Sequence, residues 1–320
     1  MTKARTVATK EQAHHGRRIG WTLFKVAFAV ALFGGALWLL RHQLQQTSIH
    51  QILADFAAMP RWRIAAAIGA TVLSYAFLGA SEWWALEMVG RKLESWRILL
   101  VTVVSYTMSN GLGFSLATGG AARLRFYRGW GFKGTEIAAV TLLAGIAVTL
   151  SGFVTVGLAL QAVHGVPFSL HVIGLVMLAP AWLWLGHLPK RVKFLPGVEL
   201  VHPPLRTRVL ALSGGIFDWI LSGLALLLLM PGQPGNHIAP FLAVFVLGSV
   251  ISAASGVPGG IGVFEAVVLT LSRHFALPHQ TAAALVLYRL IYAIGPLFLT
   301  ATGLAIAQFR ATHRHVRSRR

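Results

Sequence analysis

Acidic side chains are scarce in this chain. The 320 residues include 28 Lys and Arg but only 9 Asp and Glu, which gives a formal net charge of +19. Charged residues of both signs make up 12% of the chain, whereas 56% of it is hydrophobic and the mean hydropathy is +0.68. This composition excludes an ordinary soluble domain and predicts an integral membrane protein.

Cysteine is absent, which excludes disulfides and cysteine-ligated metal sites. Several catalytic signatures are missing as well: a Gly-x-Ser-x-Gly element, a phosphate-binding Gly-Lys-Ser/Thr loop and a dinucleotide-binding fingerprint. None of the 13 His pairs with a carboxylate at metal-ligand spacing. We therefore expect no catalytic residue, no metal and no cofactor.

Both ends of the chain are basic. They carry Lys3, Arg5, Lys10, Arg17 and Arg18, and Arg310, Arg314, Arg317, Arg319 and Arg320. In a membrane protein such ends mark the cytoplasmic side and contact anionic lipid, which is a simpler interpretation than nucleic-acid binding. We therefore expect basic cytoplasmic tails at residues 1–20 and 308–320, a single transmembrane domain at residues 21–307, and no nucleic-acid partner.

Long apolar segments predict an all-α membrane protein, since a crossing takes roughly 20 apolar residues. Six segments are uninterrupted: Trp21–Leu40, Ile64–Gly90, Ile137–Leu160, Leu170–Leu188, Val209–Met230 and Thr281–Ala307. No small-residue cleavage pattern follows the first segment, so we expect a retained helix there. Two more segments, Ile98–Ala122 and Ala239–Leu271, are interrupted by glycines. Leu44–Met59 has the apolar spacing of a helix lying at the membrane interface.

Basic loop residues predict which helix ends face the cytoplasm. The loop Pro189–Arg208 is rich in Lys and Arg, whereas Gln161–Ser169 and Pro231–His237 contain neither. Basic clusters also flank Ile98–Ala122 on both sides. All of these basic loops face the cytoplasm, and the two uncharged loops face outward, if Ile98–Ala122 enters and leaves on the cytoplasmic side and Ala239–Leu271 enters and leaves on the outer side. We therefore expect six transmembrane helices, two re-entrant broken helical hairpins, and both termini in the cytoplasm.

The same topology predicts an inverted repeat, with halves at residues 21–160 and 169–307. Each half contains two crossings, a hairpin and a further crossing. The second crossing of each half carries an acid followed by tryptophan, Glu82-Trp83 and Asp218-Trp219. Transporters often combine inverted repeats with discontinuous helices that meet near the bilayer midplane.

Ionisable residues well inside apolar segments are the first candidates for a site. They are Glu82, Asp218, Glu265 and Arg289. A charge in hydrocarbon costs about 3 kcal/mol on insertion scales, so these side chains should face inward, with Arg289 paired to Glu265 or Asp218. They mark a substrate site or only hold helices together, and the first interpretation is favoured. If a helix begins near Gly262, Glu265 offsets its positive dipole end, which favours pairing with Arg289 over phosphate binding there.

Glycine-rich turns are the second candidates. The two hairpin turns contain Asn110, Gly111, Gly119 and Gly120, and Pro258, Gly259, Gly260 and Gly262. Arg123, Arg125 and Tyr127 follow the first turn; the arginines could hold a lipid phosphate by paired hydrogen bonds, or serve as cytoplasmic anchors. Tyr288 and Tyr292, four residues apart, share a helix face with Arg289 and either line a cavity or stabilise the packing.

Three stretches carry a family resemblance. They are Glu82-Trp-Trp-Ala-Leu86; Asn110-Gly-Leu-Gly-Phe-Ser115 with Gly119-Gly-Ala-Ala-Arg123-Leu-Arg125-Phe-Tyr127; and Pro258-Gly-Gly-Ile-Gly-Val-Phe-Glu265 with Tyr288-Arg289. Together they resemble the transmembrane domain of lysylphosphatidylglycerol synthase, the multiple peptide resistance factor. The match covers nearly the whole chain and is nearest to the stand-alone YbhN-like inner-membrane proteins. Glu82 stands where the family usually has Asp.

The resemblance implies a lipid translocator. In the full-length synthases this domain is expected to move aminoacylated phosphatidylglycerol between leaflets, after a separate soluble domain has made that lipid. No such domain follows in this sequence, so we do not expect aminoacyl transfer. The expected cargo is a phospholipid of the bacterial inner membrane, aminoacylated or not, or a polyprenyl-linked lipid. Its head group would pass Glu82, Asp218, Glu265 and Arg289, with its phosphate received by Arg123 and Arg125.

Two alternatives stay open at this point. The first is a membrane-embedded lipid-modifying transferase whose acids act as bases. The second is a non-catalytic partner of a lipid-synthesis complex, in which the intramembrane charges only hold helices together. The protein could also form a homo-oligomer.

Overall fold

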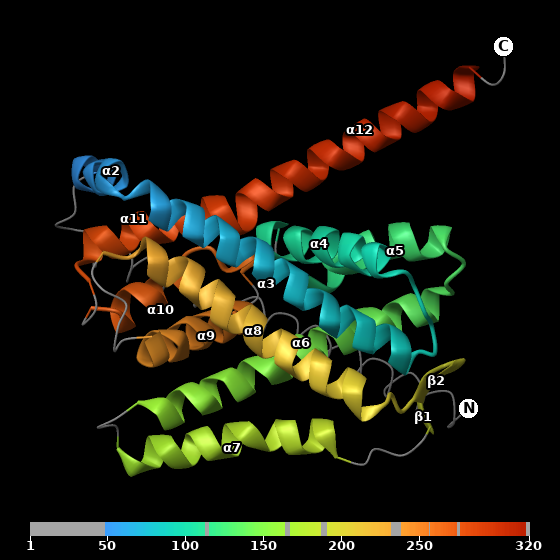
Figure 1. The fold of residues 1–320 in the computed structure, drawn as a ribbon, viewed down its shortest axis with the longest axis horizontal. Coiled ribbons are helices and arrows are strands. Elements are labelled where there is room, and N and C mark those ends of the chain that lie inside the picture. The colour runs from blue at the N-terminus through green and yellow to red at the C-terminus, as the bar shows by residue number, and fades with distance from the viewer. Residues whose placement is uncertain are drawn as a thin grey trace, which may run out of the picture.

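The computed structural model describes residues 49–112, 115–163, 167–186, 191–231, 238–255, 257–273 and 276–317, most of them helical (Figure 1). The predicted crossing Trp21–Leu40, the N-terminal tail and the end of the C-terminal tail lie outside these residues. The predicted interfacial helix is present as α2 (Ile49–Ala58) within its described part. It packs against α11 (Pro278–Tyr288), where Asp55 Oδ2 lies 2.7 Å from His279 Nδ1.

Helices long and apolar enough to cross a membrane fit the predicted class of protein. Within the described ranges there are 4 such spans: α3 (Arg61–Met88), α6 (Gly134–Ala162), α8 (Leu205–Leu229) and the continuous segment Pro278–Ile306. The last comprises α11, the π-helix η3 (Arg289–Ile294) and the start of α12 (Gly295–Arg317). The predicted crossing Leu170–Leu188 is the helix α7 (Phe168–Leu185), whose apolar part is shorter, Phe168–Ala179.

A small sheet departs from the all-α prediction. Strands β1 (Arg191–Leu195) and β2 (Val198–Val201) form an antiparallel pair inside the basic loop before α8. The turn contains Gly197 at a φ of 76°, a conformation that glycine adopts without strain. Val198 and Leu200 are buried against the helices, so the sheet is tied to the helical core.

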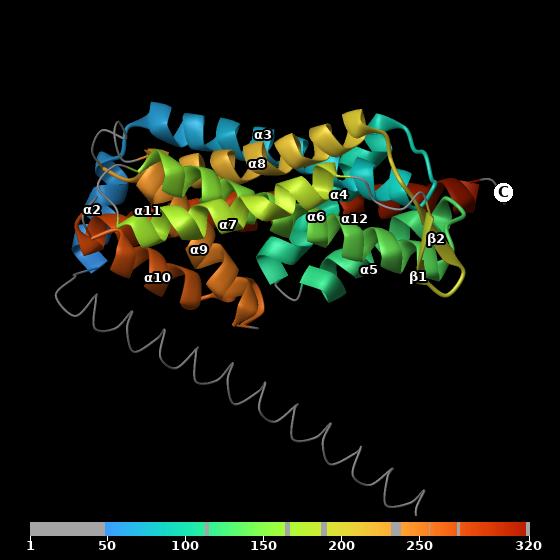
Figure 2. The same ribbon diagram turned by 90° about the horizontal axis from the view of Figure 1, so that it is seen from below.

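Helices α3 and α8 pack side by side along most of their length (Figures 1 and 2). They run in opposite directions, as residue pairs such as Phe77 with Phe217 and Ser74 with Asp218 require. Close approach depends on Gly214, because a Cβ at this position would lie only 2.6 Å from the Ala80 Cβ. Small residues that let helix backbones come together are typical of membrane interfaces.

Two helical hairpins lie against this pair. The first consists of α4 (Ser95–Leu112) and α5 (Ser115–Gly129); the second consists of α9 (Ile238–Ala254), the 3₁₀ turn η2 (Pro258–Gly260) and α10 (Val263–Leu271). In Figure 1 the outer ends of α4 and α5 lie at the end of the molecule that holds β1 and β2, and α9 and α10 lie toward the other end. The end of α4 meets the turn of the second hairpin, since a Cβ at Gly259 would lie 3.6 Å from the Gly111 carbonyl oxygen.

The glycines play different parts in the two hairpins. Gly119 and Gly120 lie inside α5, and their assignment to the turn was wrong. Gly119 instead lets α4 and α5 pack, because a Cβ there would lie 2.5 Å from Ser109 Oγ. In the second turn the assignment is correct: Gly259 and Gly260 have φ values of 63° and 60°, which L side chains rarely adopt.

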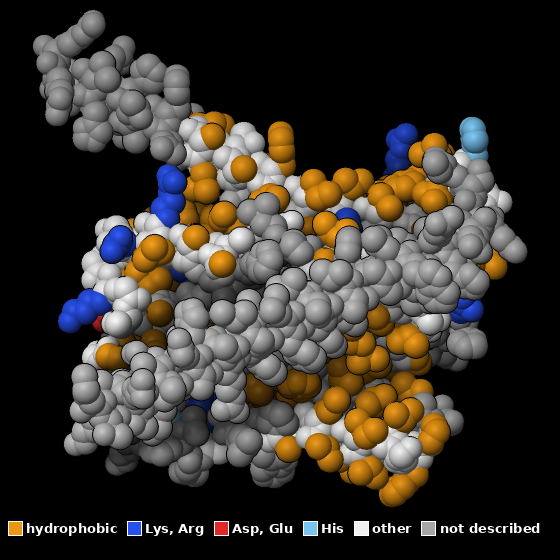
Figure 3. Space-filling model, turned by 180° about the vertical axis from the view of Figure 1, so that it is seen from behind, with side chains coloured by type: hydrophobic (Ala, Val, Ile, Leu, Met, Phe, Trp, Pro, Cys, Tyr) orange, Lys and Arg blue, Asp and Glu red, His pale blue; other side chains and the backbone are white. Residues whose placement is uncertain are grey.

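Hydrophobic side chains cover much of the described surface. Figure 3 shows them spread over one face, with most of the visible Lys and Arg toward the two ends of the view. Large residues such as Phe298 and Leu299 are 72% and 73% exposed. Apolar exposure of this extent is expected for helices surrounded by lipid, and is unfavourable in water.

Candidate functional site

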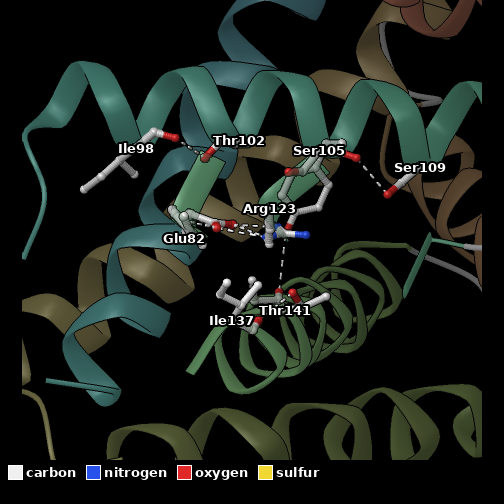
Figure 4. A network of polar contacts seen from close by, with 11 residues as sticks. Glu82, Ile98, Thr102, Ser105, Ser109, Arg123, Ile137 and Thr141 are labelled. Atoms are coloured by element: carbon white, nitrogen blue, oxygen red, sulfur yellow. Dashed lines mark hydrogen bonds and ion pairs between the residues drawn. The ribbon is translucent and has the colours of Figure 1, made fainter. Parts of the chain in front are cut away.

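A buried ion pair joins α3 to α5. Glu82 is 0% exposed and Arg123 is 4% exposed, and Figure 4 shows them pointing toward each other between α4 and α6. Arg123 donates from Nε to Glu82 Oε1 at 2.9 Å and from Nη2 to Oε2 at 2.6 Å. The Tyr127 hydroxyl, one helical turn further along α5, donates to Oε1 as well. The carboxylate therefore accepts hydrogen bonds from two nitrogens of the guanidinium and from the phenol.

Neighbouring side chains hold Arg123 in this orientation. The Tyr106 ring of α4 lies 5.3 Å from the guanidinium carbon, within the range of a cation–π contact. Gly119 leaves room for the guanidinium, since a Cβ there would lie 3.3 Å from Nη1. Ser105, beside Arg123 in Figure 4, is fully buried and its hydroxyl has no hydrogen-bond partner among the described residues.

The position of Arg123 differs from its expected role at the cytoplasmic surface. The helix α5 runs back toward α3, and Arg123 faces inward while Arg125 faces outward and is exposed. Two arginines at positions i and i+2 of a helix point in different directions, so they cannot jointly grip one phosphate without rearrangement. In this conformation Glu82 occupies the paired donors of Arg123.

A second ion pair joins the other hairpin to the π-helix. Arg289 donates from Nε to Glu265 Oε1 at 2.6 Å and from Nη1 to the Gly259 carbonyl oxygen at 2.7 Å. Of the two partners predicted for Arg289, the structure brings Glu265 to it and leaves Asp218 elsewhere. The Phe264 ring lies 5.9 Å from its guanidinium carbon. Each pair thus has an aromatic ring close to the arginine.

Glu265 also caps the helix that carries it. The Gly262 N–H donates to Glu265 Oε2 at 2.8 Å, and α10 begins at Val263. A carboxylate in the first turn offsets the positive end of the helix dipole, as the sequence predicted. One carboxylate therefore fixes both the start of α10 and the arginine of η3.

A cluster of oxygen atoms surrounds Asp218 between α3, α8 and η3. Ser74 Oγ donates to Asp218 Oδ1, and Ser222 Oγ donates to the Asp218 carbonyl oxygen at 2.6 Å. The Tyr292 hydroxyl lies 2.9 Å from Ser222 Oγ and 3.1 Å from Ser74 Oγ. Asp218 itself is 4% exposed.

Sequence reasoning missed Ser74 and Ser222, although a signal was available. Ser222 follows Asp218 by one helical turn, and Ser74 precedes Glu82 by two turns on the predicted crossing. Hydroxyls on the face of a membrane helix that carries an acid are candidates for its hydrogen-bond partners. The pairing across α3 and α8 depends on their antiparallel packing, which the sequence does not specify.

Tyrosines connect this cluster to the first hairpin. Tyr75 donates to the Tyr292 carbonyl oxygen at 3.0 Å and accepts from Asn110 Nδ2 at 3.3 Å. Tyr292 stacks on Tyr288, with ring centroids 5.0 Å apart. Through Tyr75 the Tyr292 carbonyl of η3 is linked to Asn110 near the end of α4, and through Arg289 the π-helix contacts the turn of the second hairpin.

The chemistry available at these clusters is ionic recognition. Within the described ranges, no group of three or more His, Cys, Asp or Glu side chains is arranged to hold a metal ion. The buried arginines can exchange a carboxylate for another oxyanion, because phosphate presents the same paired acceptors to a guanidinium.

The helices and the buried charge pairs define a polytopic membrane protein of mostly helical fold. The chain belongs to the family of the lysylphosphatidylglycerol synthase transmembrane region, whose model matches residues 26–300. The resemblance stated from the three sequence stretches is therefore confirmed.

Two relatives match over most of their length. Uncharacterized protein slr0712 of Synechocystis is 30% identical over 283 residues, or 85% of this chain and 87% of that protein. Inner membrane protein YbhN of Escherichia coli is 26% identical over 292 residues, or 87% and 91% of the two chains. A third relative, phosphatidylglycerol lysyltransferase of Staphylococcus xylosus, is 25% identical over 302 residues, which are 91% of this chain but 35% of that enzyme.

Proposed function

We propose that this protein moves a lipid with an anionic or aminoacylated head group between the leaflets of the bacterial inner membrane. The observation that carries the proposal is the meeting of two helical hairpins, where the end of α4 at Gly111 approaches the second turn at Gly259. Each hairpin contributes one member of an arginine–glutamate pair, buried for Glu82–Arg123 and partly buried for Glu265–Arg289. Broken helices that meet inside a membrane domain are the usual place for a polar substrate to cross.

The proposal includes the membrane topology. The hairpin α4–α5 would enter and leave on the cytoplasmic side, and α9–α10 on the outer side, within six crossings and two inverted halves. Basic loops support this arrangement, because the α3–α4 loop, with Lys92, and the α5–α6 loop, with Lys133, lie at the end of the bundle that holds β1 and β2 (Figure 1), where Arg91 pairs with Glu136. Both termini would then face the cytoplasm.

The proposed substrate path includes the residues expected from the sequence. They are Arg123, Arg125, Tyr127, Glu82, Asp218, Glu265, Arg289, Tyr288 and Tyr292. An incoming phosphate would replace Glu82 at Arg123, with Arg125 guiding it from the cytoplasmic end, and later replace Glu265 at Arg289. Each arginine would keep an anionic partner during this exchange, while the displaced glutamate would have to take up a proton or another donor, because a lone carboxylate in the membrane is unfavourable.

The buried Ser105 hydroxyl supports a polar occupant near Arg123. It lies at the α4–α5 contact and has no partner among the described side chains. A buried polar group without a partner is unfavourable by about 1–3 kcal/mol, and a ligand oxygen at this point would satisfy it.

A vesicle assay tests the proposal. The full chain would be reconstituted with fluorescent phosphatidylglycerol, its lysyl derivative or a neutral-head-group lipid, and leaflet exchange followed by quenching of the outer leaflet. We expect exchange with wild type and at least tenfold slower exchange for Arg289→Ala and Glu265→Gln. Arg206→Ala, which removes an exposed arginine at the start of α8, is the matched control and should exchange at the wild-type rate.

Wild-type exchange at the rate of protein-free vesicles for every lipid tested would contradict the proposal. A lipid product of changed mass would instead favour the transferase alternative. Exchange of all lipids at equal rates would contradict the part of the proposal that assigns head-group recognition to the arginines.

A further inference from the structure

Asp218 differs from the other two acids of the candidate site. Glu82 and Glu265 each accept hydrogen bonds from an arginine. Asp218 is buried, at 4% exposure, yet in the part of the chain that the structure describes its side chain accepts only from neutral hydroxyls. The ionised form of this carboxyl therefore has no neighbouring positive charge to stabilise it.

Phenols are the titratable neighbours of Asp218 in the described contacts. The Tyr292 hydroxyl contacts the Ser74 and Ser222 hydroxyls, Tyr288 stacks on Tyr292, and the Tyr75 ring centroid lies 5.4 Å from that of Tyr292. Glu82, two turns along α3 from Ser74, is paired with Arg123. Helix α9 has no charged or titratable residue, and the only one in α6 is Glu136, at its distant start. Helix α7 contacts the opposite end of α8, where its Trp184 donates to the Arg208 carbonyl oxygen.

An ionised carboxylate in such a place is unfavourable, because burial in hydrocarbon removes water and no cation replaces it. One hydroxyl, that of Ser74, softens this effect by donating to Oδ1, but a neutral donor compensates less than an arginine does. A proton taken from water converts the carboxylate into a neutral acid and removes the penalty. Since Oδ1 already accepts from Ser74, Oδ2 would carry that proton.

We infer that Asp218 takes up and releases a proton in each working cycle, and that this proton couples lipid movement to the proton gradient. The coupling rests on the proposed function, whereas the proton site can be tested by itself. The oxygens of Asp218, Ser74, Ser222 and Tyr292 bond to one another, which favours a proton over a larger cation as the occupant.

The contacts of the cluster provide a route from the proton to the hairpins. A carboxylate only accepts hydrogen bonds, while a carboxylic acid also donates one, so protonation changes which hydroxyls donate around Tyr292. Tyr292 belongs to η3, and π-helical segments are rare and frequently found at functional sites. The same segment carries Arg289, which holds Gly259 and Glu265 of the second hairpin.

Infrared spectroscopy of the reconstituted full chain tests the proton site without any lipid transport. We expect wild type to show the C=O stretch of a protonated carboxyl that disappears as pH is raised from about 5 to 9. Asp218→Asn should lack this band, and Glu265→Gln, which removes an arginine-paired acid, should keep it. Ser74→Ala keeps the carboxyl but removes the hydroxyl that donates to its ionised form, so the band should persist to higher pH.

A wild type without the band, or an Asp218→Asn variant that retains it, would overturn the proton site. Should Asp218→Asn fail to fold, the direction of the shift in Ser74→Ala still decides, and a shift to lower pH or none would overturn it.

Leaflet exchange under an imposed pH difference tests the coupling. Wild-type exchange should change at least threefold when the gradient is reversed, and exchange by Asp218→Asn should be the same in both directions. A gradient-independent wild type would overturn the coupling but leave the proposed function standing. A carboxyl band in a protein that moves no lipid would uphold the proton site and refute the proposed function.

Discussion

At the scale of single residues, the Glu82–Arg123 pair should be sensitive to substitution because both side chains are buried. Arg123→Ala would leave a carboxylate with 0% exposure facing only the Tyr127 hydroxyl. Breaking a buried pair from one side costs about 3–5 kcal/mol, since the remaining charge has no partner. We expect a clear loss of thermal stability in detergent, measured by the temperature at which half of the protein remains soluble.

A double substitution distinguishes the loss of the whole ion pair from the loss of one partner. Glu82→Gln with Arg123→Met removes both charges and should be less destabilising than Arg123→Ala alone. Arg128→Ala, at an exposed position in the last turn of α5, is the control and should change stability by less than about 1 kcal/mol. A double variant less stable than the single one would contradict the interpretation of a charge pair.

The two ion pairs were not equally predictable. Arg289 and Glu265 both lie inside apolar segments, so the cost of an isolated charge was enough to suggest that they pair. Arg123 lies beside Arg125 in a basic stretch, and a basic flank is ordinarily exposed. Its burial follows from the direction of α5 and from the space at Gly119, and both are properties of the packed structure.

At the scale of elements, the second hairpin depends on glycine geometry. Gly260 has a φ of 60°, and a Cβ there would overlap Ser252 Oγ. Gly260→Ala should destabilise the protein by about 1–3 kcal/mol, because an alanine in this conformation is strained whatever the space. Gly303→Ala is the control: Gly303 lies in α12 with nothing within 4 Å, so the substitution should be neutral or stabilise the helix.

Ser252→Ala combined with Gly260→Ala distinguishes strain from collision. Ser252→Ala removes the hydroxyl that would overlap the new Cβ of residue 260 but leaves the positive φ of that residue unchanged. Partial recovery in a thermal melt is therefore expected, and full recovery would show that collision alone accounts for the loss.

The hairpins show how much of the arrangement of helices and turns the sequence predicts. Interrupted apolar segments located both hairpins, because a break at membrane depth is tolerated only inside protein or beside water. The position of the first turn was wrong in part, since Gly119 and Gly120 serve helix packing inside α5. Strands β1 and β2 were missed because the short alternating pattern of Arg191–Val201 is hidden among basic residues.

At the scale of the whole molecule, the opposed hairpins predict how the chain lies in the membrane. The loops at Lys92 and Lys133 would both face the cytoplasm with the β1–β2 turn at Pro196, and Leu277 would face outward. Since the chain has no cysteine, one cysteine can be placed at each position in turn without removing a native thiol. In intact spheroplasts a membrane-impermeant maleimide should label only the variant at Leu277, and after lysis it should label all four. Labelling of Lys92→Cys and Lys133→Cys from opposite sides would mean that the first hairpin crosses the membrane, and would refute the inverted topology from which the proposed function is built.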